Sequence, residues 1–301
     1  MKKLLTLLLL LAVCGTTQTD AFAAKRDKQR KLNYTITDIG AEEFTFYTDI
    51  RYGERPERLR KENDPSDRLL DLYVPKTKAP AGGYPVFFFV HGGGFSGGNK
   101  SHAKLGYDRM CRAMAERGYV AVSINYYLTM RHHKVEGVSC GSQMKNGLPE
   151  GGKYHPIVHR AMESAASDAT LALQWLKEHA KELGINMKDL TVCGGSAGAI
   201  TVLQLAYFTK QKAAPIKCVV NLWGAVAQPS AIEKPAPPMI IYHGDKDALV
   251  HVDYAHAFEA RLKELGVRVE KHIMQGKGHA QYGLIVQKYC DEIDAFIKSI
   301  Q

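Results

Sequence analysis

The chain has 301 residues, of which 45% are hydrophobic and 24% are charged, and its formal net charge at pH 7 is +9. This is the balance of an ordinary globular protein, long enough for one large domain, since α/β domains often run to about 250 residues, or for two small ones. A basic chain can bind nucleic acids, but no nucleic-acid-binding motif accompanies the charge, so we predict a basic globular protein without a nucleic-acid partner.

The N-terminal residues 1–23 are predicted to form a secretory signal peptide. A short basic start precedes an almost wholly apolar stretch at residues 4–13, and Ala21 and Ala23 supply the small side chains of a cleavage site. This stretch is shorter than the ~20 residues of a membrane-spanning helix, so we expect no stable membrane insertion after cleavage. A lipoprotein modified at Cys14 is less favoured, since a valine precedes this cysteine. We therefore expect a secreted or periplasmic protein, cleaved after Ala23.

The mature chain is predicted to begin with a basic tail at residues 24–33 and to continue as one domain over residues 34–301. The first part of the domain has short alternating segments that indicate strands, at residues 34–39, 44–47 and 69–74. A turn rich in proline and glycine follows at residues 76–83. These first strands precede the regular part of the chain.

From residue 86 onward, predicted strands alternate with predicted helices. The run at residues 86–90, Val-Phe-Phe-Phe-Val, is apolar throughout, as expected for a central parallel strand that is buried on both faces. Further strands are predicted at residues 119–124, 190–193, 218–222, 239–242 and 267–273, and helices at residues 105–117, 161–183, 197–208, 254–265 and 282–300. This alternation predicts an α/β fold, with a mostly parallel central sheet covered by helices on both faces. Ligands bind such sheets at the carboxyl ends of the strands.

One segment, residues 129–159, matches no element. It is long, lacks periodicity and is rich in Gly, His, Lys and Met. Because loops beyond ~15 residues are usually functional or disordered, we predict that it roofs the active site, with a disordered surface loop as the alternative.

Five cysteines remain after the predicted cleavage: Cys111, Cys140, Cys193, Cys218 and Cys290. Their wide spacing fits neither a zinc site nor a small disulfide scaffold. Cys193 and Cys218 lie in apolar strand patterns and are predicted to be packed thiols. The sequence leaves disulfide pairing open.

Residues 194–198, Gly-Gly-Ser-Ala-Gly, follow a predicted strand and open a predicted helix. This is the Gly-x-Ser-x-Gly pattern, whose small residues allow a turn tight enough to lift the serine hydroxyl above the sheet. The helix N-terminus behind the serine favours incoming negative charge. We therefore predict that Ser196 is a nucleophile; an inert serine in a glycine-rich connection is the alternative.

Residues 91–95, His-Gly-Gly-Gly-Phe, directly follow the apolar strand at residues 86–90. Three consecutive glycines cost chain entropy and add no packing, so they make sense where backbone amides must approach a ligand closely. Acyl transfer passes through a tetrahedral oxyanion that such amides stabilise. We assign this oxyanion hole to the amides of Gly93, Gly94 and Ala197, with a plain flexible turn as the alternative.

A serine hydroxyl needs a base, and twelve histidines are available. His279 lies between a late strand and the last helix, where it would overhang the carboxyl edge of the sheet. We predict it as the base, in its neutral form. The acid that orients the imidazole is predicted to be Asp247, with Asp245 as the alternative, since both follow the strand at residues 239–242.

In their order along the chain, four landmarks resemble the α/β-hydrolase superfamily, and within it carboxylesterases with a His-Gly-Gly-Gly motif, such as the hormone-sensitive-lipase-like group. The landmarks are residues 91–95, Asn125-Tyr126, residues 194–198, and His243-Gly244-x-x-Asp247 followed by Gly278-His279. The resemblance starts near residue 70 and implies the α/β-hydrolase fold. It also implies Asp247 as the acid and Gly93, Gly94 and Ala197 as the oxyanion hole. Secreted enzymes of this kind resemble esterases that remove acetyl or feruloyl groups from polysaccharides.

The predicted function is serine-dependent hydrolysis of carboxylic esters through an acyl-enzyme, with short acyl esters or polysaccharide-linked acetyl or feruloyl esters as substrates. The prediction includes neither a metal nor an organic cofactor. A serine peptidase of the oligopeptidase type is one alternative, although such enzymes usually carry a large extra domain. A non-catalytic binding protein on a hydrolase scaffold is another, although such proteins typically lose a member of the triad.

Overall fold

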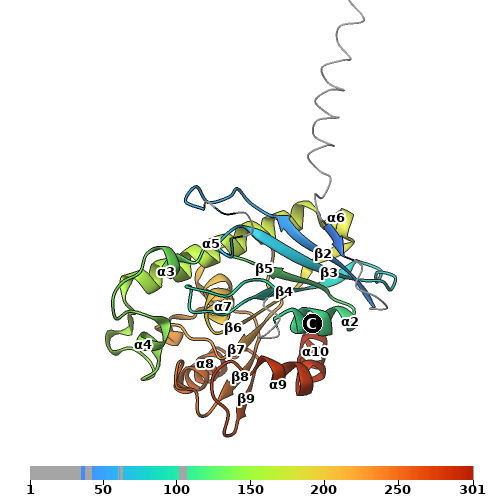
Figure 1. The fold of residues 1–301 in the computed structure, drawn as a ribbon. Helices are drawn as coiled ribbons and strands as arrows, with labels where there is room; N and C mark the ends of the chain where they lie inside the picture. The colour runs from blue at the N-terminus through green and yellow to red at the C-terminus, as the bar shows by residue number, and fades with distance from the viewer. Residues whose placement is uncertain (1–34, 38–42, 60, 62–63, 102–106, 301) are drawn as a thin grey trace, which may run out of the picture. The chain divides into compact units, whose positions relative to one another are not determined.

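The computed structural model describes residues 35–37, 43–59, 61, 64–101 and 107–300 (Figure 1). The predicted signal peptide, residues 1–23, and the predicted basic tail, residues 24–33, lie outside these ranges. From Thr35 onward the chain belongs to one structural unit. The helices in the described part of this unit are too short or too polar to cross a lipid bilayer.

A nine-stranded sheet forms the centre of this unit, in the order β1-β2-β3-β5-β4-β6-β7-β8-β9. The strands are β1 (Thr35–Thr37), β2 (Phe44–Arg51), β3 (Leu69–Pro75), β4 (Tyr84–Val90), β5 (Val120–Ile124), β6 (Ile185–Gly195), β7 (Cys218–Leu222), β8 (Met239–Gly244) and β9 (Val269–Met274). The six strands β4 to β9 run parallel to one another, whereas the pairs β1–β2, β2–β3 and β3–β5 are antiparallel. The predicted mostly parallel sheet is therefore confirmed.

Helices cover both faces of this sheet, as the alternation in the sequence predicts. Figure 1 shows α2, α9 and α10 on one side and α5 and α7 on the other. The longer helices are α2 (Tyr107–Glu116), α5 (Pro156–Glu178), α7 (Ala197–Leu203), α8 (Asp253–Glu264), α9 (Tyr282–Lys288) and α10 (Cys290–Ser299). The core between the layers includes Phe87, Phe88 and Phe89 of β4, all fully buried. The five described cysteines are buried as well, and all five thiols are free.

Parallel register aligns the carboxyl ends of the central strands. Val90 pairs with Gly194, Gly195 with Leu222, and Gly244 with Met274. The segments that follow β4, β6, β7, β8 and β9 therefore leave the sheet at one edge, which we call the carboxyl edge. The predicted nucleophile, base, acid and glycine turn all belong to these segments.

Residues 129–159, predicted as one irregular loop, contain several short helices, which corrects that prediction. The segment holds α3 (Thr129–His132), α4 (Cys140–Met144), the 3₁₀ turn η1 (Glu150–Gly152) and the start of α5. A capping box begins α4: the Ser142 amide donates to the Ser139 hydroxyl at 3.0 Å, and the Ser139 amide donates to the Ser142 hydroxyl at 2.9 Å. Such short helices depend on caps rather than on a hydrophobic period, so periodicity does not reveal them.

Other predicted elements differ at their ends. The helix predicted to begin at residue 161 begins at Pro156, where proline occupies the first turn and the His155 imidazole accepts from the Ile157 amide at 3.2 Å. It ends at Glu178, and the short α6 (Ala180–Leu183) follows. The helix predicted over residues 282–300 divides into α9 and α10 at Tyr289.

Candidate active site

Ser196 stands on a strained turn between β6 and α7. Its backbone has φ 57° and ψ −125°, a left-handed conformation that costs a side-chain-bearing residue of order 1–3 kcal/mol. The Ser196 amide donates to the Leu222 carbonyl at 3.0 Å, and its carbonyl accepts from the Ile200 amide at 2.9 Å. A side chain at Gly198 would collide with the Val90 carbonyl. The small residues of the motif thus permit the close approach of helix to strand, which fixes the serine at the carboxyl edge.

His279 lies beside this serine, in the connection between β9 and α9. Its Nε2 is 2.8 Å from the Ser196 Oγ, and its Nδ1 is 2.7 Å from Oδ2 of Asp247. The ring also packs edge-on against the buried Trp223, with 6.3 Å between the ring centroids. The imidazole is therefore held from two sides and can take a proton from the hydroxyl while facing a carboxylate.

Asp247 is buried and accepts hydrogen bonds through both carboxylate oxygens. Its Oδ1 accepts from the amides of Leu249 and Val250, both at 2.9 Å. Burial by itself would raise the pKa of Asp247, but hydrogen bonds from His243, His279 and a backbone amide outweigh it and hold this pKa well below its ordinary value. The carboxylate therefore stays ionised where it faces the imidazole.

The alternative acid, Asp245, does not contact His279. Its amide donates to the Met274 carbonyl at 3.3 Å, and its buried Oδ1 has no hydrogen-bond partner among the described residues. The geometry therefore favours Asp247 over Asp245 as the partner of the imidazole, in agreement with the order of preference at the sequence level.

His243 also contacts the site, a role that the landmark at residues 243–247 does not assign to it. It is fully buried, and its Nε2 lies 2.8 Å from the Val250 carbonyl and 3.4 Å from Oδ2 of Asp247. The Asp247 carboxylate therefore lies between two imidazoles, those of His243 and His279. The spacing of four residues between His243 and Asp247 is the signal in the sequence that could have revealed this contact.

The glycine turn after β4 lies against Ser196. A Cβ built on Gly92 would be 3.2 Å from the Ser196 Cβ. Gly93 and Gly94 have φ values of 121° and 61°, and no described residue accepts a hydrogen bond from either amide. Because the first bond of α7 runs from Ile200 to Ser196, the Ala197 amide also lacks a partner within the helix. The backbone amides of Gly93, Gly94 and Ala197 thus have no acceptor among the described residues, and their segments meet at Ser196.

Buried polar contacts hold this turn from behind. The Tyr126 hydroxyl donates to the His91 carbonyl at 2.9 Å, and the Lys100 amide donates to Oδ1 of Asn125 at 2.7 Å. The Lys100 ammonium is nearly buried and pairs with the fully buried Asp71 of β3 at 2.6 Å. These bonds tie the end of the turn to β3 and to the segment after β5, which limits its movement.

The segment of residues 129–159 connects both sides of the site. On one side, the Met130 amide donates to the Phe95 carbonyl at 3.0 Å, next to the glycine turn. On the other, the His251 amide donates to the Met144 carbonyl at 3.1 Å, and the Tyr254 hydroxyl donates to the Gly147 carbonyl at 2.7 Å. The segment therefore contacts both the glycine turn and the loop that carries Asp247. The described residues contain no cluster of His, Cys, Asp and Glu side chains that could hold a metal ion.

Two family models match the chain. The model described as Phospholipase/Carboxylesterase matches residues 140–298, more than half of the 301 residues. The model described as BD-FAE matches residues 70–137. The first range contains Ser196, Asp247 and His279, and the second contains the glycine turn.

Known proteins are similar to this chain as well. It is 27% identical over 191 residues to the uncharacterized esterase/lipase C417.12 of Schizosaccharomyces pombe. This alignment covers 61% of this chain and 33% of that protein. The match thus spans about a third of that relative's length. A propionate-bound thermophilic esterase from Thermogutta terrifontis has 21% identity and a TM-score of 0.59, covering 83% of this chain and 95% of its own. MGS-M1, an α/β-hydrolase from a deep-sea metagenome library, has 17% identity and a TM-score of 0.60, with 86% and 98% covered. The α/β-hydrolase fold predicted from the sequence is thereby confirmed.

Proposed function

This chain belongs to the phospholipase/carboxylesterase family, and we propose that it is a serine esterase that hydrolyses carboxylic esters through an acyl-enzyme. The observation that carries the proposal is the unbroken series of hydrogen bonds from Ser196 through His279 to Asp247. The similar esterase of Thermogutta terrifontis is phosphorylated by paraoxon, in a structure with 19% identity to this chain. Organophosphates modify activated nucleophiles, so this neighbour supports a serine mechanism.

In the acylation step, the Ser196 Oγ attacks the acyl carbon while Nε2 of His279 takes its proton. Asp247 stabilises the imidazolium that forms. The carbonyl oxygen becomes an oxyanion, to which the amides of Gly93, Gly94 and Ala197 donate hydrogen bonds. The imidazolium then gives its proton to the leaving alcohol, and the acyl group remains on Ser196. Since these amides have no other partner in the described part of the chain, no hydrogen bond within that part must break before they act.

In the deacylation step, a water molecule takes the place of the alcohol. His279 accepts a proton from the water as its oxygen attacks the acyl carbon, and the same amides stabilise the second oxyanion. Collapse of this intermediate returns the proton to Ser196 and releases the carboxylic acid. Apart from the ester and this water molecule, the scheme uses groups of the chain alone.

The proposed substrates are short acyl esters or polysaccharide-linked acetyl or feruloyl esters, with residues 129–159 as a roof over them. Three large hydrophobic side chains remain exposed among the described residues: Val135, Leu148 and Leu249, at 39%, 43% and 49%. Two belong to the roof segment, and the third follows Asp247 by two residues. Leu249 is the one nearest to Asp247 along the chain, so we propose that it contacts an apolar part of the ester.

We also propose that the enzyme acts outside the cytoplasm, after cleavage behind Ala23. This part of the chain lies outside the described residues, and the support is the sequence pattern alone. Mass spectrometry of the protein recovered from the periplasm or the medium tests it. A mature N-terminus at Ala24 is expected, whereas an intact Met1 or a lipidated Cys14 would contradict the proposal.

The test of the esterase proposal combines labelling with turnover. Wild type should react with a fluorophosphonate probe at Ser196 and hydrolyse p-nitrophenyl acetate, whereas Ser196→Ala should do neither. A chain-length series of p-nitrophenyl esters, with acetylated xylan, methyl ferulate and a peptide panel, would define the substrate class. Wild type that neither labels nor turns over esters would refute the proposal, and cleavage of peptides without cleavage of esters would indicate a peptidase.

A further inference from the structure

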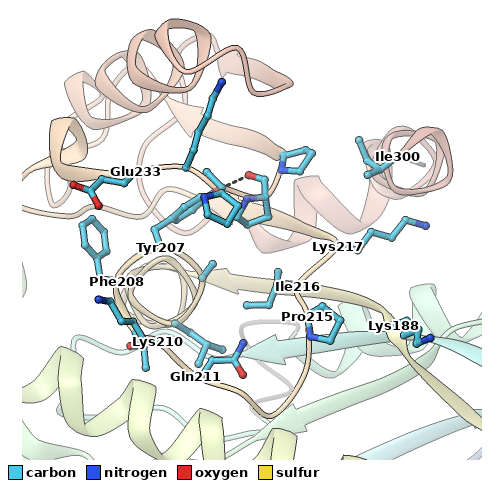
Figure 2. Close-up of a pocket in the computed structure, with 18 of the residues that line it drawn as sticks. Lys188, Tyr207, Phe208, Lys210, Gln211, Pro215, Ile216, Lys217, Glu233 and Ile300 are labelled. Carbon is cyan, nitrogen blue, oxygen red and sulfur yellow. Dashed lines mark hydrogen bonds between the residues drawn. The ribbon is translucent and has the colours of Figure 1, made fainter.

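A cleft of about 970 Å³ lies at the opposite edge of the sheet from Ser196. Its walls come from the start of β6, from residues 205–211 after α7, and from the segments just before β7 and β8. Figure 2 shows Lys188 and Lys217 at one side of this cleft and Phe208, Lys210 and Glu233 at the other. All these segments lie at the amino ends of parallel strands, so the cleft is separate from the proposed ester site.

The cleft is positively charged by lysines that have no ion-pair partner. Lys188, Lys210 and Lys234 are exposed, and none of them pairs with a carboxylate in the described part of the chain. Lys217 differs, because it pairs with Asp189 at 3.0 Å. Exposed lysines without partners keep their charge available for an anionic ligand.

Neighbouring hollows extend this cleft along the surface. One of about 570 Å³ shares Lys210 and Gln211 with it, and another of about 450 Å³ shares Lys188 and Gln211. These hollows add two further exposed lysines without ion pairs, Lys212 and Lys177. We call the joined cleft and hollows the lysine trough, defined by Lys177, Lys188, Lys210, Lys212 and Lys234. Its charges are spread along a surface channel rather than gathered at one point, which suits an extended ligand.

The floor of the trough is apolar and partly rigid. The turn η2 (Gln204–Phe208) is a π-helix, closed by the Thr209 amide donating to the Gln204 carbonyl at 2.8 Å. Turns of this type occur frequently at functional sites. The Tyr207 hydroxyl donates to the Pro237 carbonyl at 2.9 Å and ties the turn to the proline-rich segment before β8. Phe208 and Pro235 remain partly exposed, so they offer flat apolar surface to a ligand.

We propose that the lysine trough binds an acidic polysaccharide, a chain of sugars that carry carboxylates. The lysines would pair with the carboxylates, and the apolar C–H faces of the sugar rings would pack on Phe208 and the prolines. Glu233 and Asp189 also line the trough, and they can accept hydrogen bonds from sugar hydroxyls. A concave channel does not match a flat membrane, and competition by single-stranded DNA in the test below separates a polysaccharide from a nucleic acid.

This inference goes beyond ester hydrolysis, because the two sites are far apart. Lys188 lies seven positions before Gly195 on β6, which corresponds to roughly 23 Å at ~3.3 Å per residue. A polymer in the trough therefore leaves Ser196 accessible. The trough would hold the protein on an acidic matrix while the carboxyl edge faces away from the bound chain.

The test measures binding to immobilised polygalacturonate by interferometry at 150 mM salt, with the full protein carrying Ser196→Ala so that catalysis plays no part. The trough variant is Lys188→Gln, Lys210→Gln and Lys234→Gln together. The matched control replaces the exposed lysines Lys61, Lys78 and Lys288 by Gln, which removes the same charge elsewhere. We expect affinity to fall about tenfold or more in the trough variant and less than twofold in the control.

Three probes complete the experiment. A neutral galactan should bind at least tenfold more weakly than polygalacturonate, and single-stranded DNA and phosphatidylglycerol vesicles should not displace the polysaccharide. Absence of polygalacturonate binding, or an equal loss in both triple variants, would overturn the proposal. Stronger binding of DNA or vesicles would overturn it in favour of those ligands. Failure of the ester assay leaves each of these outcomes unchanged, so the two proposals fail separately.

Discussion

The two edges of the sheet place their polar groups in opposite ways. At the carboxyl edge, Asp247 is buried and both its oxygens are bonded, and His279 is hydrogen-bonded on both ring nitrogens. At the amino edge, Lys188 and Lys210 are exposed and have no ion-pair partner among the described residues. The first arrangement fixes geometry, and the second leaves charges free to follow a flexible ligand.

The difference follows from what each edge is proposed to do. Proton transfer needs atoms held within a few tenths of an ångström, which burial and multiple hydrogen bonds provide. Attraction of a polymer needs only charge of the right sign, which exposed lysines provide at low structural cost. The carboxyl edge should therefore be sensitive to small changes, and the predictions below begin with the largest.

Removing the hydroxyl of Ser196 should have the largest effect. In Ser196→Ala, kcat for p-nitrophenyl acetate should fall about 10⁴- to 10⁶-fold, because no other group can form the acyl-enzyme. The melting temperature should stay near that of wild type. Ser299→Ala is the control and should keep full activity, because among the described residues this hydroxyl is bonded only to the Phe296 carbonyl. Turnover retained in Ser196→Ala would show that the carboxyl edge does not work as proposed.

Neutralising Asp247 should have the second-largest effect on kcat. Asp247→Asn should lower kcat by about 10⁴, because an amide cannot hold the imidazole in its working tautomer or stabilise its charge. Asp245→Asn is the matched control, since this side chain does not contact His279, and it should lose less than about threefold. Steady-state kinetics of both variants decide the comparison. The reverse order would make Asp245 the acid.

The glycine turn should respond according to the space at each position. A Cβ at Gly93 would collide with the Gly97 backbone, so Gly93→Ala should displace the turn and lower kcat by about 10² to 10³, as loss of one oxyanion donor does. At Gly94 the nearest atom to a Cβ would be 3.8 Å away, so Gly94→Ala should add only about 1 kcal/mol of backbone strain. Its kcat should fall less than about tenfold. Equal losses would mean that the amides are not positioned by this packing.

The lowered pKa of Asp247 should appear in the dependence of stability on pH. Since the folded state holds this pKa below its unfolded value of about 3.8, ionised Asp247 stabilises the fold above about pH 4, and the gain disappears as pH falls through the lowered pKa. Asp247→Asn should therefore be about 1–3 kcal/mol less stable than wild type at pH 7, and the gap should narrow near pH 3. Urea unfolding at both pH values measures this gap. A gap that stays constant with pH would contradict the burial and bonding described for this carboxyl.

The smallest effect is expected at Leu249, which is exposed although it belongs to the carboxyl edge. Leu249→Ser should raise KM for p-nitrophenyl butyrate about three- to tenfold and leave kcat within about twofold, because it removes apolar contact without touching the reacting atoms. The matched control is p-nitrophenyl acetate, whose KM should change less. An equal effect on both esters would show that this side chain does not contact the acyl group.

The chemistry of the carboxyl edge could be predicted from the sequence because it restricts which residues fit. Gly194 and Gly198 must be small for strand and helix to approach, and Asp247 and His279 follow strands whose ends share one edge. His243 was not identified as a contact of the acid, because a buried histidine before a glycine is common and its partner is visible only in three dimensions.

The structure of two other regions could not be predicted from the hydrophobic pattern or from the motifs of the sequence. Residues 129–159 form helices of four or five residues, which show no hydrophobic period and depend on caps such as Ser139. The lysine trough combines Lys188, Lys210 and Lys234, which belong to three separate segments. No local motif joins them, because the fold alone brings their segments to one edge.

The five buried thiols of the described residues can be used to follow local and global unfolding of the protein. Burial raises the pKa of Cys140 to about 12 and that of Cys290 to about 11, so little reactive thiolate exists in the closed fold. An alkylating reagent can therefore modify them only after local or global unfolding. Cys290 lies at the start of α10, whereas Cys193 lies in the centre of the sheet on β6. The alkylation rate of Cys290 would therefore report local unfolding of α10, and that of Cys193 would report unfolding of the central sheet. Neither measurement requires a probe to be added to the chain.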